Sequence, residues 1–374
     1  MRGRMIKGLL ISEIVSHIES LYHPSLKLEF DNPGLHIGFN KRIKNVLVAL
    51  DPLIEVIDYA VMNKCELIVS HHPIIPPDKE EFIDENNVIH RRIIKAIQNR
   101  ISVYCCHTPI DVSTKGINFR MAGLIGLSSL EYIKVTARKN RLKLVTFIPE
   151  KYMDKLIDRL SREGAGVIGN YTECAFYSKG TGRFKGNEKS LPAIGNKNKR
   201  EFVDEFRVEM ILDEENRDRV EKALTENHPY EEPAYEFYRI DSPYENQGIG
   251  IIGKLSKPVK LRELINRLKR ILKIDTVRVN TADLDKEVRI IAYSGGSGGS
   301  LIKDVIKSKA EVYICGDLKL YNGQEAKEAG LITIDAGHYH TEKVFIELMS
   351  KHLKQLKDIN VKGYRKTTDY FINA

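Results

Sequence analysis

The chain has 374 residues, of which 42% are hydrophobic and 29% are charged, a balance that is typical of globular proteins. Lys and Arg exceed Asp and Glu by eight (59 against 51), and only Lys197, Lys199 and Arg200 form a short basic group. This composition excludes long disorder, collagen and coiled coil. It makes nucleic acid an unlikely partner, because nucleic-acid binding requires basic residues gathered on one face.

The length predicts two or three domains. No apolar run approaches the roughly 18 residues that a membrane span needs, so no membrane partner is expected. The N-terminal run GLLI is too short for a secretory leader and is followed by Ser12 and Glu13, which predicts a cytoplasmic protein. The cysteines are odd in number and lack a C-x-x-C spacing, so we expect reduced thiols at Cys65, Cys105, Cys106, Cys174 and Cys315.

The first third of the chain alternates short apolar strands with helices. Strands are expected at Asn45–Asp51, Glu66–Ser70 and Ile101–Cys106, and helices at Glu55–Met62, Asn87–Gln98 and Asn118–Leu127. Strands that are apolar throughout and joined by helices indicate a parallel sheet buried on both faces.

The middle of the chain follows a different order. Strands are expected at Leu144–Ile148, Thr172–Ser178, Phe206–Leu212 and Ala234–Ile240, and helices at Tyr152–Arg162 and Glu214–Asn227. The order β-α-β-β-α-β is that of a ferredoxin-like α+β unit. Junctions near Leu127–Glu131 and Ser242–Gly250 flank it, which predicts an inserted domain at 131–248.

The last third returns to the first pattern. Strands are expected at Val288–Tyr293, Ala310–Cys315 and Leu331–Asp335, a Gly-rich turn at Ser294–Ser300, and helices at Leu301–Ser308 and Thr341–Leu356. The predicted fold class is therefore α/β. A mostly parallel sheet core built from both termini (1–130 and 249–374) is interrupted by the ferredoxin-like insert.

Polar residues that follow the strands of the core are the first candidates for a functional site. Ligands of open parallel sheets bind outside the carboxyl ends of the strands. At such ends the sequence places four histidines and two carboxylates, which we expect at one edge of one sheet: His71, His72, His107, Asp111, His338 and Glu342.

The spacing of these residues favours a pair of metal ions. Adjacent side chains of an extended segment point in opposite directions, so His71 and His72 suit two neighbouring ions better than one. His338 and Glu342 are four residues apart and share one face of a helix. Taken singly, each has an ordinary alternative, such as a solvated His–Glu pair or, for Asp111, a capping acid. Together they fit a dinuclear site for zinc, iron or manganese, with His107 orienting a ligand or a water, but their spacing does not fix the number of ions.

Two further segments are candidates for substrate contact. The turn SGGSGGS, with Ser294, Gly295 and Gly296, could hold an anion on its backbone N–H groups; otherwise it is a tight turn between strand and helix. It matches neither a Walker A motif nor GxGxxG. Asp317, at another strand end, is a candidate for substrate contact or for support of the site.

Seven segments occur in the order seen in the NIF-three-like dinuclear-metal-centre proteins, many of which are named GTP cyclohydrolase 1 type 2 homologues. They are DNPGLHIG (31–38), SHHP (70–73), HTPID (107–111), IGIIGKL (249–255), YSGGSG (293–298), CGDL (315–318) and GHYHTE (337–342). The middle of the chain also resembles the PII- or CutA-like insert of the long bacterial members, through GNYTEC (169–174), GTGRF (180–184) and HPYEEP (228–233).

The resemblance implies two metal ions per subunit, zinc first among the candidates, held by His71, His72, Asp111, His338 and Glu342, with Glu342 bridging. It also implies a toroidal homohexamer and a hydrolase acting on a nucleotide or related phosphorylated heterocycle. A non-catalytic role in metal binding, metal delivery or regulation stays open as the alternative.

The chain departs from the family pattern at several positions. Pro109 and Ile110 replace the usual Asn and Leu, and Pro33 is also less usual. Tyr321 lies where the family commonly carries a histidine, which removes any role of that histidine in proton transfer.

Overall fold

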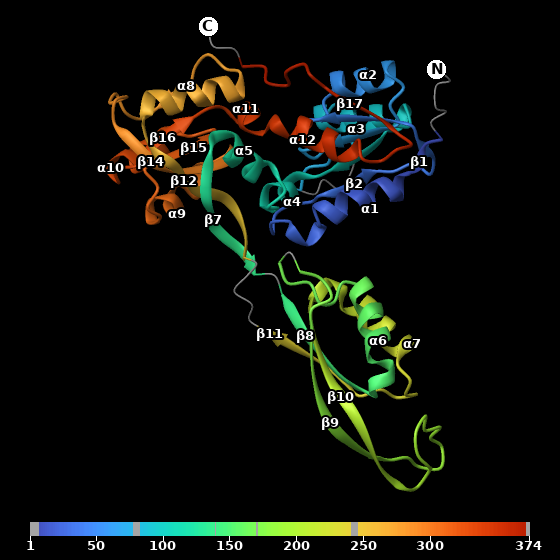
Figure 1. Ribbon diagram of the computed structural model, residues 1–374. Helices are drawn as coiled ribbons and strands as arrows, with labels where there is room; N and C mark the ends of the chain where they lie inside the picture. The colour runs from blue at the N-terminus through green and yellow to red at the C-terminus, as the bar shows by residue number, and fades with distance from the viewer. Residues whose placement is uncertain (1–6, 78–82, 139, 170, 241–245, 372–374) are drawn as a thin grey trace, which may run out of the picture. The chain divides into compact units, whose positions relative to one another are not determined.

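The computed structural model describes residues 7–77, 83–138, 140–169, 171–240 and 246–371 (Figure 1). The chain divides into two compact units, one made of residues 1–136 and 247–374 and the other of residues 137–246. The first unit is thus built from both termini, and the second is an insertion into it. The expected junction at Ser242–Gly250 lies partly outside the described residues, and its end belongs to a strand, β12 (Asn246–Lys260).

A five-stranded sheet forms one half of the first unit. Its strand order is β17 (Asn360–Gly363), β4 (Asn45–Ala49), β5 (Leu67–Ser70), β6 (Ser102–Cys105) and β2 (Gly34–Ile37). All pairs are parallel except β2 with β6. Helices α2 (Ile54–Met62) and α3 (Val88–Gln98) pack on one face, and α1 (Ile11–Leu21) and α12 (Val344–Leu353) on the other. Both faces are covered, which explains why β4, β5 and β6 are apolar almost throughout.

A six-stranded sheet forms the other half. Its order is β13 (Arg278–Val279), β16 (Ile332–Asp335), β15 (Val312–Gly316), β14 (Glu287–Ser297), β12 and β7 (Leu127–Arg138). The central strands β14, β15 and β16 are parallel, and β12 and β13 add antiparallel neighbours. Helices α5 (Ile117–Ile125) and α8 (Leu261–Leu272) cover one face, and α9 (Ile302–Lys307) and α10 (Leu320–Glu328) contribute to the core on the other.

The α/β class is confirmed, but the expectation of a single sheet edge is wrong, because the candidate residues follow strands of two sheets. The expected Gly-rich turn is also partly wrong. Strand β14 continues to Ser297, which pairs with Gly316 of β15 after an irregular stretch. The expected helix Thr341–Leu356 is two helices, α11 (His338–Glu342) and α12, joined at Lys343.

The insert has the ferredoxin-like order that the sequence predicts. Its elements are β8 (Arg141–Ile148), α6 (Glu150–Arg162), β9 (Ala175–Lys185), β10 (Arg200–Asp213), α7 (Arg217–Asn227) and β11 (Tyr235–Ile240). The sheet order is β11-β8-β10-β9 with every pair antiparallel. Leu144, Met210 and Leu212 of the sheet meet Leu156 of α6 and Leu224 of α7 in a core of its own.

Because the insert has its own core, we predict that deleting residues 137–246 leaves a folded first unit. The two ends of the deletion lie close together, since Thr136 Oγ1 donates a hydrogen bond to the Gln247 carbonyl oxygen over 3.4 Å. A short Gly/Ser linker therefore closes the gap at little entropic cost. Circular dichroism and gel filtration check the result. An insoluble product, or one that lacks the helical signal of the first unit, would contradict it.

No helix among the described residues is long and apolar enough to cross a lipid bilayer. The five cysteines are free thiols, and all but Cys174 are buried.

Candidate metal centre

Three segments of the first unit bring the candidate residues together. His71 and His72 directly follow β5, whose buried ladder with β4 and β6 fixes their position. Asp111 lies on α4 (His107–Val112), which begins where β6 ends. His338 and Glu342 are the first and last residues of α11, which follows β16 of the other sheet. The site therefore lies where the carboxyl ends of strands from both sheets meet.

The two oxygens of the Glu342 carboxylate face different groups of donors. Oε1 lies 3.5 Å from His71 Nε2, which in turn lies 3.7 Å from Asp111 Oδ1. Oε2 lies 3.1 Å from His72 Nε2 and 3.1 Å from His338 Nε2. We call these the first half-site (His71, Asp111, Glu342 Oε1) and the second half-site (His72, His338, Glu342 Oε2).

Several of these atoms are buried without a hydrogen-bond partner. They are both ring nitrogens of His71, Asp111 Oδ1 and Glu342 Oε2. Leaving buried polar atoms unpaired costs about 1–3 kcal/mol each, so their gathering at one place requires an explanation. Potential ligand atoms of His71, His72 and Glu342 all lie within 4.8 Å of one another. The donor set of imidazoles and carboxylates suits zinc, iron or manganese, and the residues present fit a metal centre.

The electrostatics of the site differ between the two neighbouring histidines. Burial lowers the pKa of His71, whose side chain has no exposed surface, and so favours the neutral ring that a metal requires. Burial also acts to lower the pKa of His72, but the carboxylates of Glu342 and Asp51 outweigh it and raise the pKa to about 10. Burial and the nearby Glu342 raise the pKa of Asp111 well above its usual value. Bringing cations to this site relieves the repulsion between the two carboxylates.

An aspartate holds each of three histidines through its Nδ1 atom. His72 Nδ1 donates a hydrogen bond to Asp51 Oδ1 at 2.6 Å, and His107 Nδ1 donates one to Asp31 Oδ1 at 2.6 Å. His338 Nδ1 donates to Asp317 Oδ2 at 2.7 Å. Such carboxylate–histidine pairs fix the tautomer and leave Nε2 as the donor toward a metal. Asp317 is thus hydrogen-bonded to a candidate ligand, His338.

Asp51 and Asp31 are not among the site residues predicted from the sequence. Asp51 could have been found by the rule that found the histidines, because it is the first acidic residue after β4. Asp31 does not follow a strand, and its partner His107 is 76 residues away in the chain, but its place at the start of the DNPGLHIG segment could have drawn attention to it.

His107 lies beside the two neighbouring histidines. Its ring centroid is 5.6 Å from that of His71 and 5.9 Å from that of His72. Its backbone N–H donates to the His71 carbonyl oxygen at 2.9 Å, and its φ of +23° is rare for a residue with a side chain. This hydrogen bond and the one to Asp31 hold the residue in that conformation.

Two glycines of the SGGSGG segment, Gly295 and Gly296, lie against the side chain of Glu342. Gly295 N–H donates to Asn118 Oδ1 at 2.9 Å, and Gly296 N–H donates to Thr341 Oγ1 at 3.0 Å. Ser294 is buried and its hydroxyl bonds to the Tyr313 hydroxyl at 2.7 Å. A Cβ atom on Gly296, whose φ is +66°, would overlap Glu342 Oε1. The amides of Gly295 and Gly296 thus already have hydrogen-bond partners within the chain.

Tyr321, which lies where the family commonly carries a histidine, is on α10. Tyr321 has 58% of its surface exposed, and the structure gives it no contact with the half-sites.

The Asp31–His107 pair predicts a pH dependence of stability. Burial alone would raise the pKa of Asp31, but hydrogen bonds from His107 and Thr108 outweigh it and lower the pKa from 3.8 to about 2. A carboxylate with a lowered folded pKa stabilises the protein above its unfolded pKa, and this contribution is lost as the pH falls from about 4 to 2. The shift corresponds to about 2 kcal/mol.

We therefore expect the free energy of unfolding to fall less in Asp31→Asn than in the wild type as the pH is lowered from 5 to 2.5. Urea unfolding at each pH measures it. The exposed Asp154→Asn, on α6 of the insert and outside the site, is the control. If the free energy of unfolding changes with pH by the same amount in the wild type and in Asp31→Asn, the role of the pair is contradicted.

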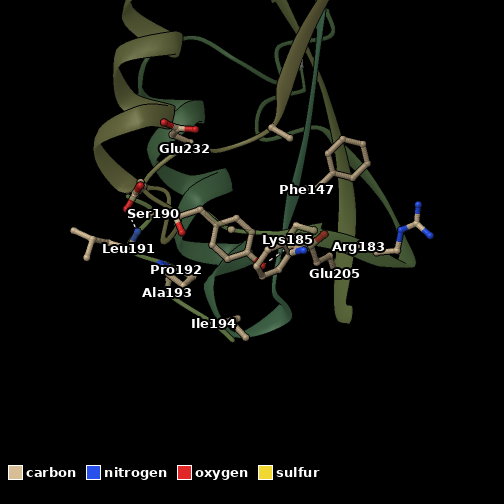
Figure 2. Close-up of a pocket in the computed structure, with 16 residues that line it drawn as sticks. Phe147, Arg183, Lys185, Ser190, Leu191, Pro192, Ala193, Ile194, Glu205 and Glu232 are labelled. Atoms are coloured by element: carbon tan, nitrogen blue, oxygen red, sulfur yellow. Dashed lines mark hydrogen bonds between the residues drawn. The ribbon is translucent and has the colours of Figure 1, made fainter. Parts of the chain in front are cut away.

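The insert contains a separate pocket of about 440 Å³ (Figure 2). Two segments that resemble the PII- or CutA-like insert, GTGRF and HPYEEP, contribute to its wall. The Tyr230 hydroxyl donates to Glu205 Oε1 at 2.6 Å, and the Leu191 N–H donates to Glu231 Oε2 at 2.8 Å. Acidic and basic side chains both line this pocket, so its charge does not single out a class of ligand.

The chain is similar to known proteins over nearly its whole length. The model of the family Duf34/NIF3 (NGG1p interacting factor 3) matches residues 9–369. A protein of Halalkalibacterium halodurans named GTP cyclohydrolase 1 type 2 homolog is 37% identical over 333 residues, 89% of each chain. One of Bacillus subtilis with the same name is 34% identical over 94% of each chain. The crystal structure of a Bacillus cereus protein related to NIF3 superimposes with a TM-score of 0.90 at 34% identity, covering 98% of this chain and 100% of that one. The chain belongs to the Duf34/NIF3 family.

Proposed function

We propose that this protein is a dinuclear metal-dependent hydrolase that acts on a nucleotide or a related phosphorylated heterocycle. The observation that carries the proposal is the division of the site into two half-sites that share one carboxylate. Each half-site offers two side chains of its own and one oxygen of Glu342, as expected of a carboxylate that bridges two ions. Zinc is the first candidate, and iron and manganese are the alternatives.

The residues have distinct roles in this proposal. Divalent ions at such a site would lower the pKa of water and polarise a substrate oxygen. Asp51 and Asp317 orient the rings of His72 and His338. Asp31 holds the Nδ1 proton of His107, which leaves His107 Nε2 to accept or give a proton beside the half-sites.

The relatives' names support GTP as the first substrate to test. The test is turnover of GTP by the protein as purified, with and without a chelator, followed by chromatography of the products. Chelator-sensitive turnover that falls strongly in His107→Ala, with metal content unchanged, supports the proposal. A metal-loaded protein that turns over neither GTP nor other nucleotides contradicts it.

A non-catalytic role in metal binding or delivery is the second candidate. It is favoured by the exposed Tyr321, which replaces a histidine common in the family and so removes a second candidate for proton transfer. Transfer of the metal to a competing chelator within seconds would favour this role, since delivery requires fast release.

We further propose that the chain assembles into the toroidal homohexamer of its family and acts in the cytoplasm. The match over nearly the whole chain supports this proposal. Light scattering of the purified protein tests the assembly: a mass near six times 42.7 kDa is expected, and a monomer would contradict it.

A further inference from the structure

A basic pocket lies beside the metal centre in the first unit. A cavity of about 970 Å³ is lined by α11, α12, the ends of α5 and α8, and the segment after β17. Five of its lining residues are cationic: Lys343, Lys351 and Lys354 lie in or beside α12, Lys273 follows α8, and Arg365 follows β17. Glu347 is the acidic residue among them, so the lining carries a net charge of +4 (five minus one, with His340 neutral).

These cations are not neutralised within the described part of the chain. There, no carboxylate lies within ion-pair distance of any of the five. Glu347 lies instead 3.7 Å from Arg120, outside the pocket lining. Lys343 Nζ contacts a neutral partner, His340 Nδ1, at 3.2 Å. Gathering like charges without counter-charges costs electrostatic free energy, which an anion in the pocket would recover.

The remaining walls indicate more than a lone ion. Met121, Leu124, Ile271 and Val344 contribute apolar surface, and Tyr339 and Tyr364 contribute aromatic rings. A cavity of this volume is in the range of sites for small organic ligands. Cations beside apolar and aromatic walls match a molecule that has phosphate groups on one part and a flat or apolar body on another.

We propose that this pocket binds a small molecule carrying a pyrophosphate group, at a site separate from the metal centre. Neither His338 nor Glu342 lines the pocket, although Tyr339 and His340 from the same helix do. Helix α11 thus contributes to both sites. The inference goes beyond the proposed hydrolase and does not depend on it.

Pyrophosphate itself is the probe, titrated into the full-length protein and followed by calorimetry. The test variant is Lys351→Gln/Lys354→Gln, because both lysines are exposed on or just after α12, away from the metal centre. The matched control is Lys303→Gln/Lys307→Gln, which removes two exposed lysines from α9, a helix that does not line the pocket. Both variants change the net charge by the same amount. Metal content is measured on every sample.

We expect wild type and control to bind one pyrophosphate per chain with affinities within about twofold, and the pocket variant to bind about tenfold more weakly or worse, since it loses two charged contacts. No binding by the wild type, or equal weakening of both variants, would overturn the proposal. Tighter binding of a single-stranded oligonucleotide than of pyrophosphate would also overturn it. If the pocket variant keeps its metal, its weaker pyrophosphate binding is due to the pocket and not to damage at the metal centre, on which the hydrolase proposal depends.

Discussion

Replacing Glu342 by Gln is expected to remove the bound metal while the protein stays folded. Glu342 is buried and its two oxygens face the two half-sites, so the isosteric amide keeps the shape but loses the negative charge that both half-sites share. Even changes to groups that only orient ligands lower metal affinity by about 10–100-fold, and the loss of a shared ligand should exceed roughly 100-fold. Elemental analysis of the purified variant measures the effect.

The matched control for this experiment is Glu347→Gln. Glu347 is exposed on α12, and its ion partner is Arg120, outside the half-sites. It should keep the wild-type metal content. Wild-type metal content in Glu342→Gln, at the same folded fraction by circular dichroism, would rule out the bridging role.

Replacing Phe345 by Ala is expected to cause the largest loss of stability among single changes near the site. The ring has no exposed surface and packs in the cluster between α12, α1 and the five-stranded sheet. Its centroid lies 5.3 Å from that of His71, so the same ring supports a candidate ligand. Truncating a buried Phe to Ala costs about 3–5 kcal/mol, through lost burial and the cavity that remains.

Urea unfolding followed by circular dichroism measures this change, and Phe371→Ala is the control. Phe371 is 94% exposed, so its truncation should change stability by less than about 0.5 kcal/mol. We also expect Phe345→Ala to hold metal less tightly, because His71 loses the surface against which its ring packs. Equal unfolding midpoints for the two variants would contradict the packing role of Phe345.

The parts of the fold that the sequence predicted are those with strong local patterns. Strand β5 is a run of apolar residues covered on both faces, and its end at Ser70 places the adjacent histidines without further information. The spacing of His338 and Glu342 needs only one helical turn to bring them onto one face, and α11 supplies it. The ferredoxin-like order of the insert likewise followed from alternation within single elements.

The parts that the sequence did not predict depend on contacts between distant segments. Strand β12 contains Gly248, Gly250 and Gly253, and so many glycines are not typical of a strand. The close approach of the neighbouring strand β7 nevertheless requires glycine at two of these positions. A Cβ atom on Gly248 would overlap the Lys134 carbonyl oxygen, and one on Gly253 would approach Leu130. The sequence therefore predicted neither β12 nor the division of the core into two sheets.

The partners of the histidines were equally hidden. Nothing in the sequence pairs Asp31 with His107 or Asp51 with His72, because only the folded chain brings each pair together. Local patterns thus indicated the candidate ligands, whereas the groups that orient them required the tertiary structure.

The central claim is that one carboxylate joins two half-sites, and anomalous X-ray diffraction at the absorption edge of the bound metal tests it most directly. Crystals of the protein purified without added metal would be used, after elemental analysis has identified the metal. We predict two anomalous peaks per chain on either side of Glu342, one beside His71 and Asp111 and the other beside His72 and His338, roughly 3.5–4 Å apart as in other two-metal sites. A single peak, or peaks away from Glu342, would contradict the account.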